Sequence, residues 1–183
     1  MRGLLSTENN NTPSTPNCPA ADLNTHSNVT IHQPRNFMNW ILKNFDSLTP
    51  HELYAILRLR SAVFVVEQNC VFQDMDDKDQ QCHHLMGWHE DLLSAYTRLV
   101  PPGLTYPEAS IGRVVTSPAV RRSGAGKTLI EKSIEEVSIL YGKGPIKIGA
   151  QLYLKQFYNS FGFEQIGDVY DEDGIDHIKM IRK

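Results

Sequence analysis

The sequence predicts an α/β domain in which one sheet carries helices on both faces. Two observations predict this fold class. The first is a pair of apolar runs, 84–90 and 92–100, that are typical of a β-hairpin. The second is a strand–loop–helix–strand unit that follows them, in which a run at 109–116 precedes an amphipathic helix and a further strand. Strands and helices mixed in this order favour a sheet covered by helices.

Residues 1–36 differ in composition from the rest of the 183-residue chain. They are rich in Asn, Thr, Ser and Pro and poor in large apolar side chains. Such a segment buries too little surface to offset the entropy of ordering it, so we expect a disordered N-terminal extension. The folded domain is expected at residues 37–183.

The first helix is marked at its start. Thr49 can cap it, Pro50 suits the first helical position, and Glu52 completes a capping box. Apolar residues then recur at helical spacing as far as Phe64. Residues 65–82, with several aspartates, are predicted to form an acidic loop region.

The remaining elements follow from apolar runs and from glycine or proline breaks. Ser123 is expected to cap a helix that Gly142 ends, and this helix has an apolar face. The other predicted elements are a short buried strand at 146–150, a short helix at 152–161 and two last strands at 163–169 and 177–181.

The segment RRSGAGKT lies just before the predicted helix at Ser123. Its small residues let backbone N–H groups approach a ligand, the helix N-terminus adds positive partial charge, and Arg121, Arg122 and Lys127 add full charges. These features favour a pyrophosphate site. A Walker A loop would need a glycine where Arg121 stands. The pattern R-x-x-G-x-G/A is matched by Arg121, Gly124 and Gly126, and a basic turn that only caps a helix remains the plain alternative.

Composition argues against several other classes of function. A net charge of −3 and a pI near 6.1 do not favour nucleic acid as a partner. No run of 18 apolar residues is present, so no membrane span is expected. The three cysteines lack C-x-x-C spacing, which favours a reducing, cytoplasmic location. Cys82, His83 and His84 lack a second ligand pair, so no metal site is expected.

Three C-terminal motifs occur in order: IGRVVTSPAVRRSGAGKTLI, IGAQLYLKQFYNSFGF and VYDEDGIDHIKM. Together with LYAILRLRSAVFVVEQNC in the first half, they resemble the ElaA-like branch of the GNAT acetyltransferase superfamily. The resemblance covers about residues 38–183. Ser123 departs from the wider family, which often carries glycine there. The resemblance implies the GNAT (acyl-CoA N-acyltransferase) fold, with a mixed, mostly antiparallel and partly splayed sheet.

The resemblance also implies acetyl-CoA as co-substrate, lying between the strand that ends at Thr116 and the strand that ends at Ala150. Backbone groups of Val114, Val115 and Thr116 would pair with the pantetheine arm. The pyrophosphate would lie against the loop formed by Arg121, Arg122, Ser123, Gly124, Ala125, Gly126 and Lys127. A homodimer is possible, because dimers are common in the superfamily.

Acetyl transfer from a thioester to an amine needs an oxyanion donor and an acid for the leaving thiolate. The resemblance assigns the acid to Tyr158, whose alternative role is that of a core aromatic, and the oxyanion donor to the N–H of Val115. Glu67 is a candidate base, since burial beside Val63–Val66 would raise its pKa. His84, its neighbour His83 and water-mediated deprotonation are alternatives.

Four further residues are expected to contact the acceptor. Arg60 could pair with a substrate carboxylate, or instead form a salt bridge with the acidic residues at 74–79. Gln68 is a second candidate, and Gln151 follows the strand where superfamily members often place a polar group. His177 lies in the motif GIDHIKM.

The sequence therefore predicts an N-acetyltransferase that acts on an amine of a small molecule or a peptide. One alternative is an enzyme similar to acyl-homoserine-lactone synthases, which have a run like Arg60, Val63 and Phe64 followed by acidic residues. The other is a module that binds acyl-CoA without turnover.

Overall fold

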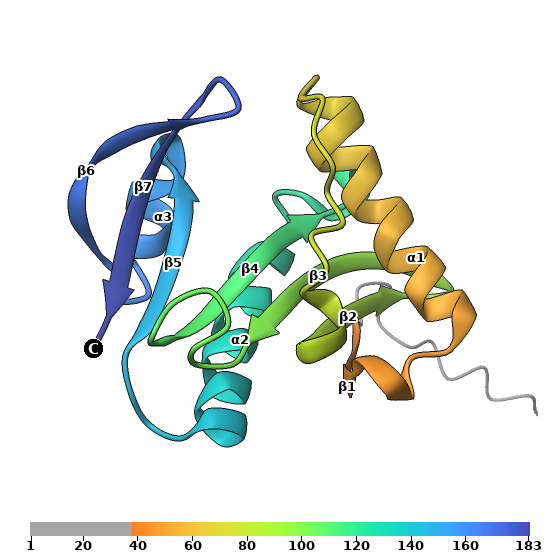
Figure 1. Cartoon of the computed structure of the whole chain (residues 1–183). Helices are drawn as coiled ribbons and strands as arrows, with labels where there is room; N and C mark the ends of the chain where they lie inside the picture. The colour runs from red at the N-terminus through yellow and green to blue at the C-terminus, as the bar shows by residue number, and fades with distance from the viewer. Residues whose placement is uncertain (1–37) are drawn as a thin grey trace, which may run out of the picture. The chain divides into compact units, whose positions relative to one another are not determined.

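The computed structural model describes residues 38–183, and the predicted N-terminal extension lies outside these residues. Seven strands form one sheet in the order β1-β2-β3-β4-β5-β7-β6, and every neighbouring pair is antiparallel except β4 and β5 (Figure 1). This confirms the predicted fold class. The strands are β1 Asn39–Asn44, β2 His83–His89, β3 Leu92–Val100, β4 Ala109–Thr116, β5 Ile146–Gln151, β6 Glu164–Glu172 and β7 Ile175–Arg182.

The helices begin and end close to the predicted positions. Helix α1 carries the predicted capping box, in which the Glu52 N–H donates to Thr49 Oγ1 at 3.2 Å and the Thr49 N–H donates to Glu52 Oε2 at 2.8 Å. None of the helices in residues 38–183 is long and apolar enough to cross a membrane. The helices are α1 Pro50–Arg60, the π-helical η2 Ser61–Glu67, α2 Ala125–Tyr141, α3 Lys155–Asn159 and the 3-10 turns η1 Phe45–Ser47, η3 Asp79–Gln81, η4 Pro118–Val120 and η5 Leu152–Leu154.

Helices α1 and α2 cover opposite faces of the sheet. Ile56 of α1 packs in a cluster with Met86, whereas Leu129 of α2 packs in a cluster with Leu85. Adjacent residues of a strand point to opposite faces, so the two helices lie on different sides. The C-terminal strands pack against α2 and α3 through a third cluster that contains Ile148, Ala150, Tyr158, Phe163 and Ile178.

Three local features differ from the predictions. Strand β1 was not predicted, and it pairs with β2 as an edge strand whose side chains are at most half-buried. The N-cap of α2 is Gly124, with φ of +92°, rather than Ser123, because the Ser123 hydroxyl donates to the Val120 carbonyl at 2.7 Å. The helix predicted at 152–161 is divided into η5 and α3.

Strands β4 and β5 pair only at their beginnings. Parallel pairing joins Ala109 to Ile146 and Ser110 to Lys147 and does not continue along the described strands. Beyond this point the two strands diverge (Figure 1). A β-bulge lies in the same part of β4, where Arg113, with φ of +53°, occupies the left-handed region. Bulges bend a strand and increase its twist, which directs the end of β4 away from β5.

A buried carboxylate holds this bulge in place. Asp74 Oδ1 accepts a hydrogen bond from Arg113 Nε at 2.7 Å, and the Asp74 carbonyl accepts one from Arg113 Nη2 at 2.9 Å. The other carboxylate oxygen of Asp74 accepts from Arg60 Nε at 2.8 Å. Asp74 therefore joins the end of α1 to the bulge in β4.

Asp79 extends the same network to β3. Its carboxylate accepts from Arg60 Nη1 at 2.9 Å and from Arg98 Nη1 at 2.8 Å. Arg98 also forms a bidentate pair with Asp76, at 2.6 and 2.8 Å. Burial alone would raise the pKa of both Asp76 and Asp79. Arg98 outweighs this effect at Asp76, and Arg60 and Arg98 outweigh it at Asp79, so both pKa values are lowered. The acidic loop region of the sequence is thus an ordered, charge-paired segment.

Asp79→Asn should lower the free energy of unfolding by about 3–5 kcal/mol, because removing one partner of a buried ion pair leaves uncompensated buried charge. Denaturant unfolding at neutral pH measures this change. Asp77→Asn, at an exposed neighbouring position, is the matched control and should change stability by no more than about 0.5 kcal/mol. Equal losses in the two variants would contradict the assigned role of the network.

The stability difference between wild type and Asp79→Asn should shrink in acid. The folded-state pKa of Asp79 lies below its unfolded value of about 3.9, so the unfolded chain binds more protons between these values. The stabilisation is therefore present above the unfolded pKa and is lost as pH falls through the folded pKa. Unfolding curves recorded between neutral pH and about pH 3 test this, and a constant difference would contradict it.

Candidate functional site

The loop 121–127 lies at the end of β4 and leads directly into α2. Gly126 lies against Thr116, since a Cβ built on this glycine would be 3.9 Å from Thr116 Cγ2. Arg121 Nη2 lies 3.5 Å from the Thr116 carbonyl. The structure therefore brings the predicted pyrophosphate loop to the end of the predicted pantetheine strand.

The N-terminus of α2 has the geometry of an anion site. The N–H groups of Lys127 and Thr128 donate to the Gly124 carbonyl at 3.0 and 3.1 Å, which closes the first turn. The N–H groups before them have no partners within the helix. The dipole of a 17-residue helix adds positive partial charge, and the exposed side chains of Arg121, Arg122 and Lys127 add full charges.

Glu67 forms a bidentate ion pair with the guanidinium of Arg121. Its two carboxylate oxygens accept from Arg121 Nη1 and Nη2 at 2.6 and 2.8 Å. The prediction that burial raises the pKa of Glu67 is wrong. The side chain is exposed at the end of η2, and hydrogen bonds from Arg121 lower its pKa. Glu67 is therefore an ion-pair partner of the loop in this structure.

The backbone of Val114, Val115 and Thr116 belongs to the part of β4 that has diverged from β5. Val115 pairs with Tyr96 on the β3 side. On the other side no strand of the described chain pairs with these residues, so their polar groups on that edge can bind an extended ligand. Val114 packs against the same core cluster that contains Ala150 and Tyr158.

Tyr158 lies in α3 with 5 % of its surface exposed. Its ring packs edge-on against Phe157 and Phe163, with centroids 5.2 and 6.0 Å away. Burial raises the pKa of its hydroxyl well above the usual value, which keeps the phenol protonated at neutral pH. A protonated phenol can act as an acid, and the same ring also serves the core.

The structure gives His84 an internal role. It is fully buried, with Nε2 3.0 Å from the Asp79 carbonyl and Nδ1 2.8 Å from the Tyr96 hydroxyl. A carbonyl can only accept, so Nε2 carries the proton and Nδ1 accepts from Tyr96. Burial lowers the pKa of the ring and favours this neutral form. Because both nitrogens are occupied, the expectation that His84 acts as a base does not hold.

Arg60 also has a structural role. It is fully buried, and all three of its nitrogens donate to Asp74 or Asp79. The salt bridge with the acidic residues is the alternative that the structure realises. Its guanidinium is not available to an acceptor carboxylate.

Gln68, Gln151 and His177 lie together. Gln151 Nε2 donates to Gln68 Oε1 at 3.3 Å, and Gln151 of β5 lies opposite His177 of β7. His177 Nδ1 is 2.8 Å from the Ile175 carbonyl, so Nδ1 carries the proton and Nε2 presents a lone pair. The structure thus groups three of the four residues expected to contact the acceptor.

The prediction from sequence missed four polar residues on the same face as Gln151 and His177. We call Tyr106, Lys147, Tyr170 and Lys179 the lysine–tyrosine cluster. Lys147 alternates with Ile146 and Ile148, and Lys179 with Ile178 and Met180, which are buried. This period of two in the last strands was the available signal. Tyr106 lies in the β3–β4 loop and carries no such signal.

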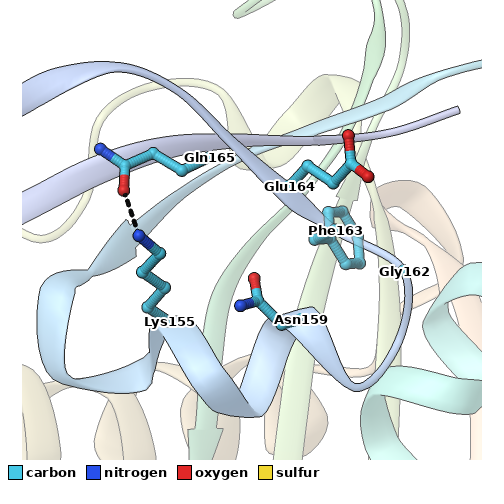
Figure 2. A pocket seen from close by; sticks show the side chains of 6 residues that line it. All are labelled: Lys155, Asn159, Gly162, Phe163, Glu164 and Gln165. Carbon is cyan, nitrogen blue, oxygen red and sulfur yellow. Dashed lines mark hydrogen bonds between the residues drawn. The ribbon is translucent and has the colours of Figure 1, made fainter.

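The structure also has a hollow beside α3. Figure 2 shows that it is formed where α3 meets the start of β6, with Lys155 donating to Gln165 Oε1 at 2.8 Å. None of the predicted site residues lines it. Its walls are Lys155, Asn159, Gly162, Phe163, Glu164 and Gln165.

The segment Cys82-His83-His84 does not converge on a common ligand. Burial raises the pKa of the Cys82 thiol to about 11, and His83 Nδ1 lies 3.1 Å from the Tyr141 hydroxyl. Within residues 38–183, no group of three or more His, Cys, Asp or Glu side chains is placed to hold a metal ion.

Comparison with known sequences gives consistent relatives. The family model of the acetyltransferase (GNAT) domain matches residues 59–183. The UPF0039 protein sll0451 of Synechocystis is 43% identical over 145 residues, which cover 79% of this chain and 94% of that protein. Protein ElaA of Escherichia coli K12 is 41% identical over 148 residues, which cover 80% of this chain and 97% of that protein.

Comparison with solved structures agrees with the sequence relatives. An acyl-CoA N-acyltransferase from Pseudomonas aeruginosa has a TM-score of 0.78 and 41% identity, over 80% of this chain and 100% of that chain. The crystal structure of E. coli ElaA has a TM-score of 0.76 and 40% identity, with the same coverage. The chain therefore belongs to the GNAT acetyltransferase family, in its ElaA-like branch.

Proposed function

We propose that this protein transfers an acetyl group from acetyl-CoA to an amine of a small molecule or peptide, by direct attack in a ternary complex. The observation that carries the proposal is the divergence of β4 from β5 beside the loop 121–127. An unpaired strand edge suits an extended pantetheine arm, and a charged helix N-terminus next to it suits a pyrophosphate. Membership of the GNAT family supports the same reaction class.

Cofactor binding would rearrange the loop. The pyrophosphate would accept from the N–H groups at the start of α2 and from Arg121, Arg122 and Lys127. Arg121 is engaged by Glu67 in the structure, so Glu67 would have to release it. The carboxylate occupies the guanidinium as a phosphate would, because both are anions that can accept from it bidentately.

The chemical step would use the backbone of β4 and the hydroxyl of Tyr158. The amine nitrogen attacks the thioester carbonyl carbon, and the Val115 N–H would stabilise the oxyanion. Collapse of the intermediate breaks the C–S bond, and Tyr158 would donate its proton to the leaving thiolate. The proton released by the amine goes to a base or to water, and Tyr158 is reprotonated from solvent.

His177 is the best-placed candidate for the base. Glu67 and His84 are engaged with Arg121, Asp79 and Tyr96. The Nε2 atom of His177 has no hydrogen-bond partner in the described part of the chain and keeps a lone pair. Its neighbours Gln151 and Gln68 would position the amine through their amide groups.

Tyr158→Phe should reduce kcat by about 10²- to 10⁴-fold, as expected for loss of a general acid, and leave the KM for acetyl-CoA nearly unchanged. Thiol release from acetyl-CoA with a panel of amines measures both constants. Tyr54→Phe, at an exposed position on α1, is the control. Full turnover by Tyr158→Phe would show that this tyrosine serves only the core.

Failure of the wild-type protein to bind acetyl-CoA by calorimetry would refute the proposed function, and binding without turnover would indicate a non-catalytic module.

Glu67→Gln should bind acetyl-CoA more tightly than wild type by a factor of about 2 to 10, because it frees Arg121 from a competing carboxylate and removes negative charge near the pyrophosphate. Calorimetry measures the affinity. Glu131→Gln, which removes the same charge from an exposed position on α2, is the control. A large fall in kcat with unchanged affinity would instead restore Glu67 as a base.

A further inference from the structure

The lysine–tyrosine cluster lies on the sheet face opposite α3. Lys147 and Lys179 are half-buried and project away from the core side of β5 and β7. Lys147 Nζ lies 4.9 Å from the centre of the Tyr106 ring, and Lys179 Nζ lies 5.4 Å from the same ring and 4.4 Å from the Tyr170 ring. Two ammonium groups and two phenols thus occupy one short stretch of the sheet.

Three of these groups converge on a position where the chain has no side chain. A Cβ atom built on Gly149 would lie 3.2 Å from Tyr170 Oη, 3.3 Å from Lys179 Nζ and 3.7 Å from Tyr106 Oη. Gly149 is exposed. The glycine therefore leaves open the point at which two hydroxyl groups and an ammonium group meet.

The two lysines of the cluster have no ion-pair partner among the described residues. No carboxylate in residues 38–183 forms an ion pair with Lys147 or Lys179. The Tyr170 hydroxyl is buried, and Lys179 and the Glu172 carboxylate lie near it without forming a hydrogen bond of good geometry. Burial raises the pKa of Tyr170, the nearby Lys179 opposes this, and Glu172 adds to it. A buried polar group without a partner is uncommon unless a ligand supplies one.

The cluster is continuous with the candidate site. Gly149 and Gln151 of β5 pair with Lys179 and His177 of β7. On the other edge of β7, His177 pairs with Tyr170 of β6. His177 and Lys179 are two residues apart on one strand, a separation of about 7 Å along the sheet. A ligand whose amine meets His177 needs only a short spacer to present an anion to Lys179.

We propose that the lysine–tyrosine cluster binds a carboxylate of the acceptor, so that the acceptor is an amine with a carboxylate a few bonds away, as in an amino acid. Lys179 would pair with the carboxylate, the hydroxyl groups of Tyr106 and Tyr170 would donate to it, and Lys147 would add a second positive charge. This proposal rests on the proposed function, because it names the class of substrate for the same site.

The test compares matched acceptors. Acetylation from acetyl-CoA is followed by mass spectrometry with the common L-amino acids and with the same amino acids as carboxamides. Removing the carboxylate should reduce kcat/KM by about tenfold or more, since a hydrogen-bonded charge contributes that much.

Lys179→Met should raise the KM for a carboxylate acceptor by about 10- to 100-fold and leave the KM for its carboxamide and for acetyl-CoA nearly unchanged. Gly149→Ala, which places a methyl group where the three polar atoms converge, should act in the same direction. Lys143→Met, at an exposed position before β5, is the matched control and should behave as wild type.

Carboxamides that react as well as the acids would overturn the proposal, and so would equal effects of Lys179→Met and Lys143→Met. If no amine of either panel is acetylated, NMR titration of the protein with the amino acids tests whether the cluster binds a carboxylate. Shifts at β5 and β7 that are lost in Lys179→Met support the proposal, and their absence overturns it. Failure of acetyl-CoA to bind would by itself count only against the proposed function. In that case too, the NMR titration tests whether the cluster binds a carboxylate.

Discussion

Asp74 joins the guanidinium groups of Arg60 and Arg113, and this contact links the end of α1 to the bulge in β4. Arg113 occupies a left-handed backbone conformation in the β4 bulge, which is costly for a residue with a side chain. The two hydrogen bonds to Asp74, at 2.7 and 2.9 Å, hold it there. Because Arg60 ends α1, the same carboxylate fixes the helix against the bulge. The acidic segment after η2 therefore fixes the position of β4, the strand that borders the candidate site.

The divergence of β4 from β5 leaves the backbone of one strand without its usual partner. Backbone polar groups need hydrogen bonds, and in this family an acyl-CoA molecule can supply them where the next strand does not. The helix that follows β4 then places positive charge at the same end. In the proposed function the bulge, the unpaired edge and the loop 121–127 would all bind the same ligand, and that ligand would displace Glu67 from Arg121.

Much of the fold could be predicted from the sequence because its signals are local. The capping box at Thr49, the hairpin at Glu90-Asp91 and the glycine that ends α2 each depend on a few adjacent residues. For Arg60 the sequence left the ion pair with residues 74–79 open as an alternative, and the structure forms it. Glu67 and His84 could not be assigned because their partners belong to other elements of the fold. Arg121 is 54 residues from Glu67, and no local pattern indicates that they pair. The lysine–tyrosine cluster combines a loop residue with residues of three strands, and only its two lysines follow an alternating pattern of buried neighbours.

A crystal structure of the protein with bound CoA would show directly whether the end of β4 and the loop 121–127 form the cofactor site. In that structure the pyrophosphate should accept hydrogen bonds from the N–H groups at the start of α2, and the pantetheine arm should run along Val114–Thr116 between β4 and β5. Glu67 should no longer contact Arg121. The Asp74 contacts to Arg60 and Arg113 should be unchanged. CoA bound elsewhere, such as in the hollow beside Lys155, with the Glu67–Arg121 pair intact, would contradict this placement of the cofactor site.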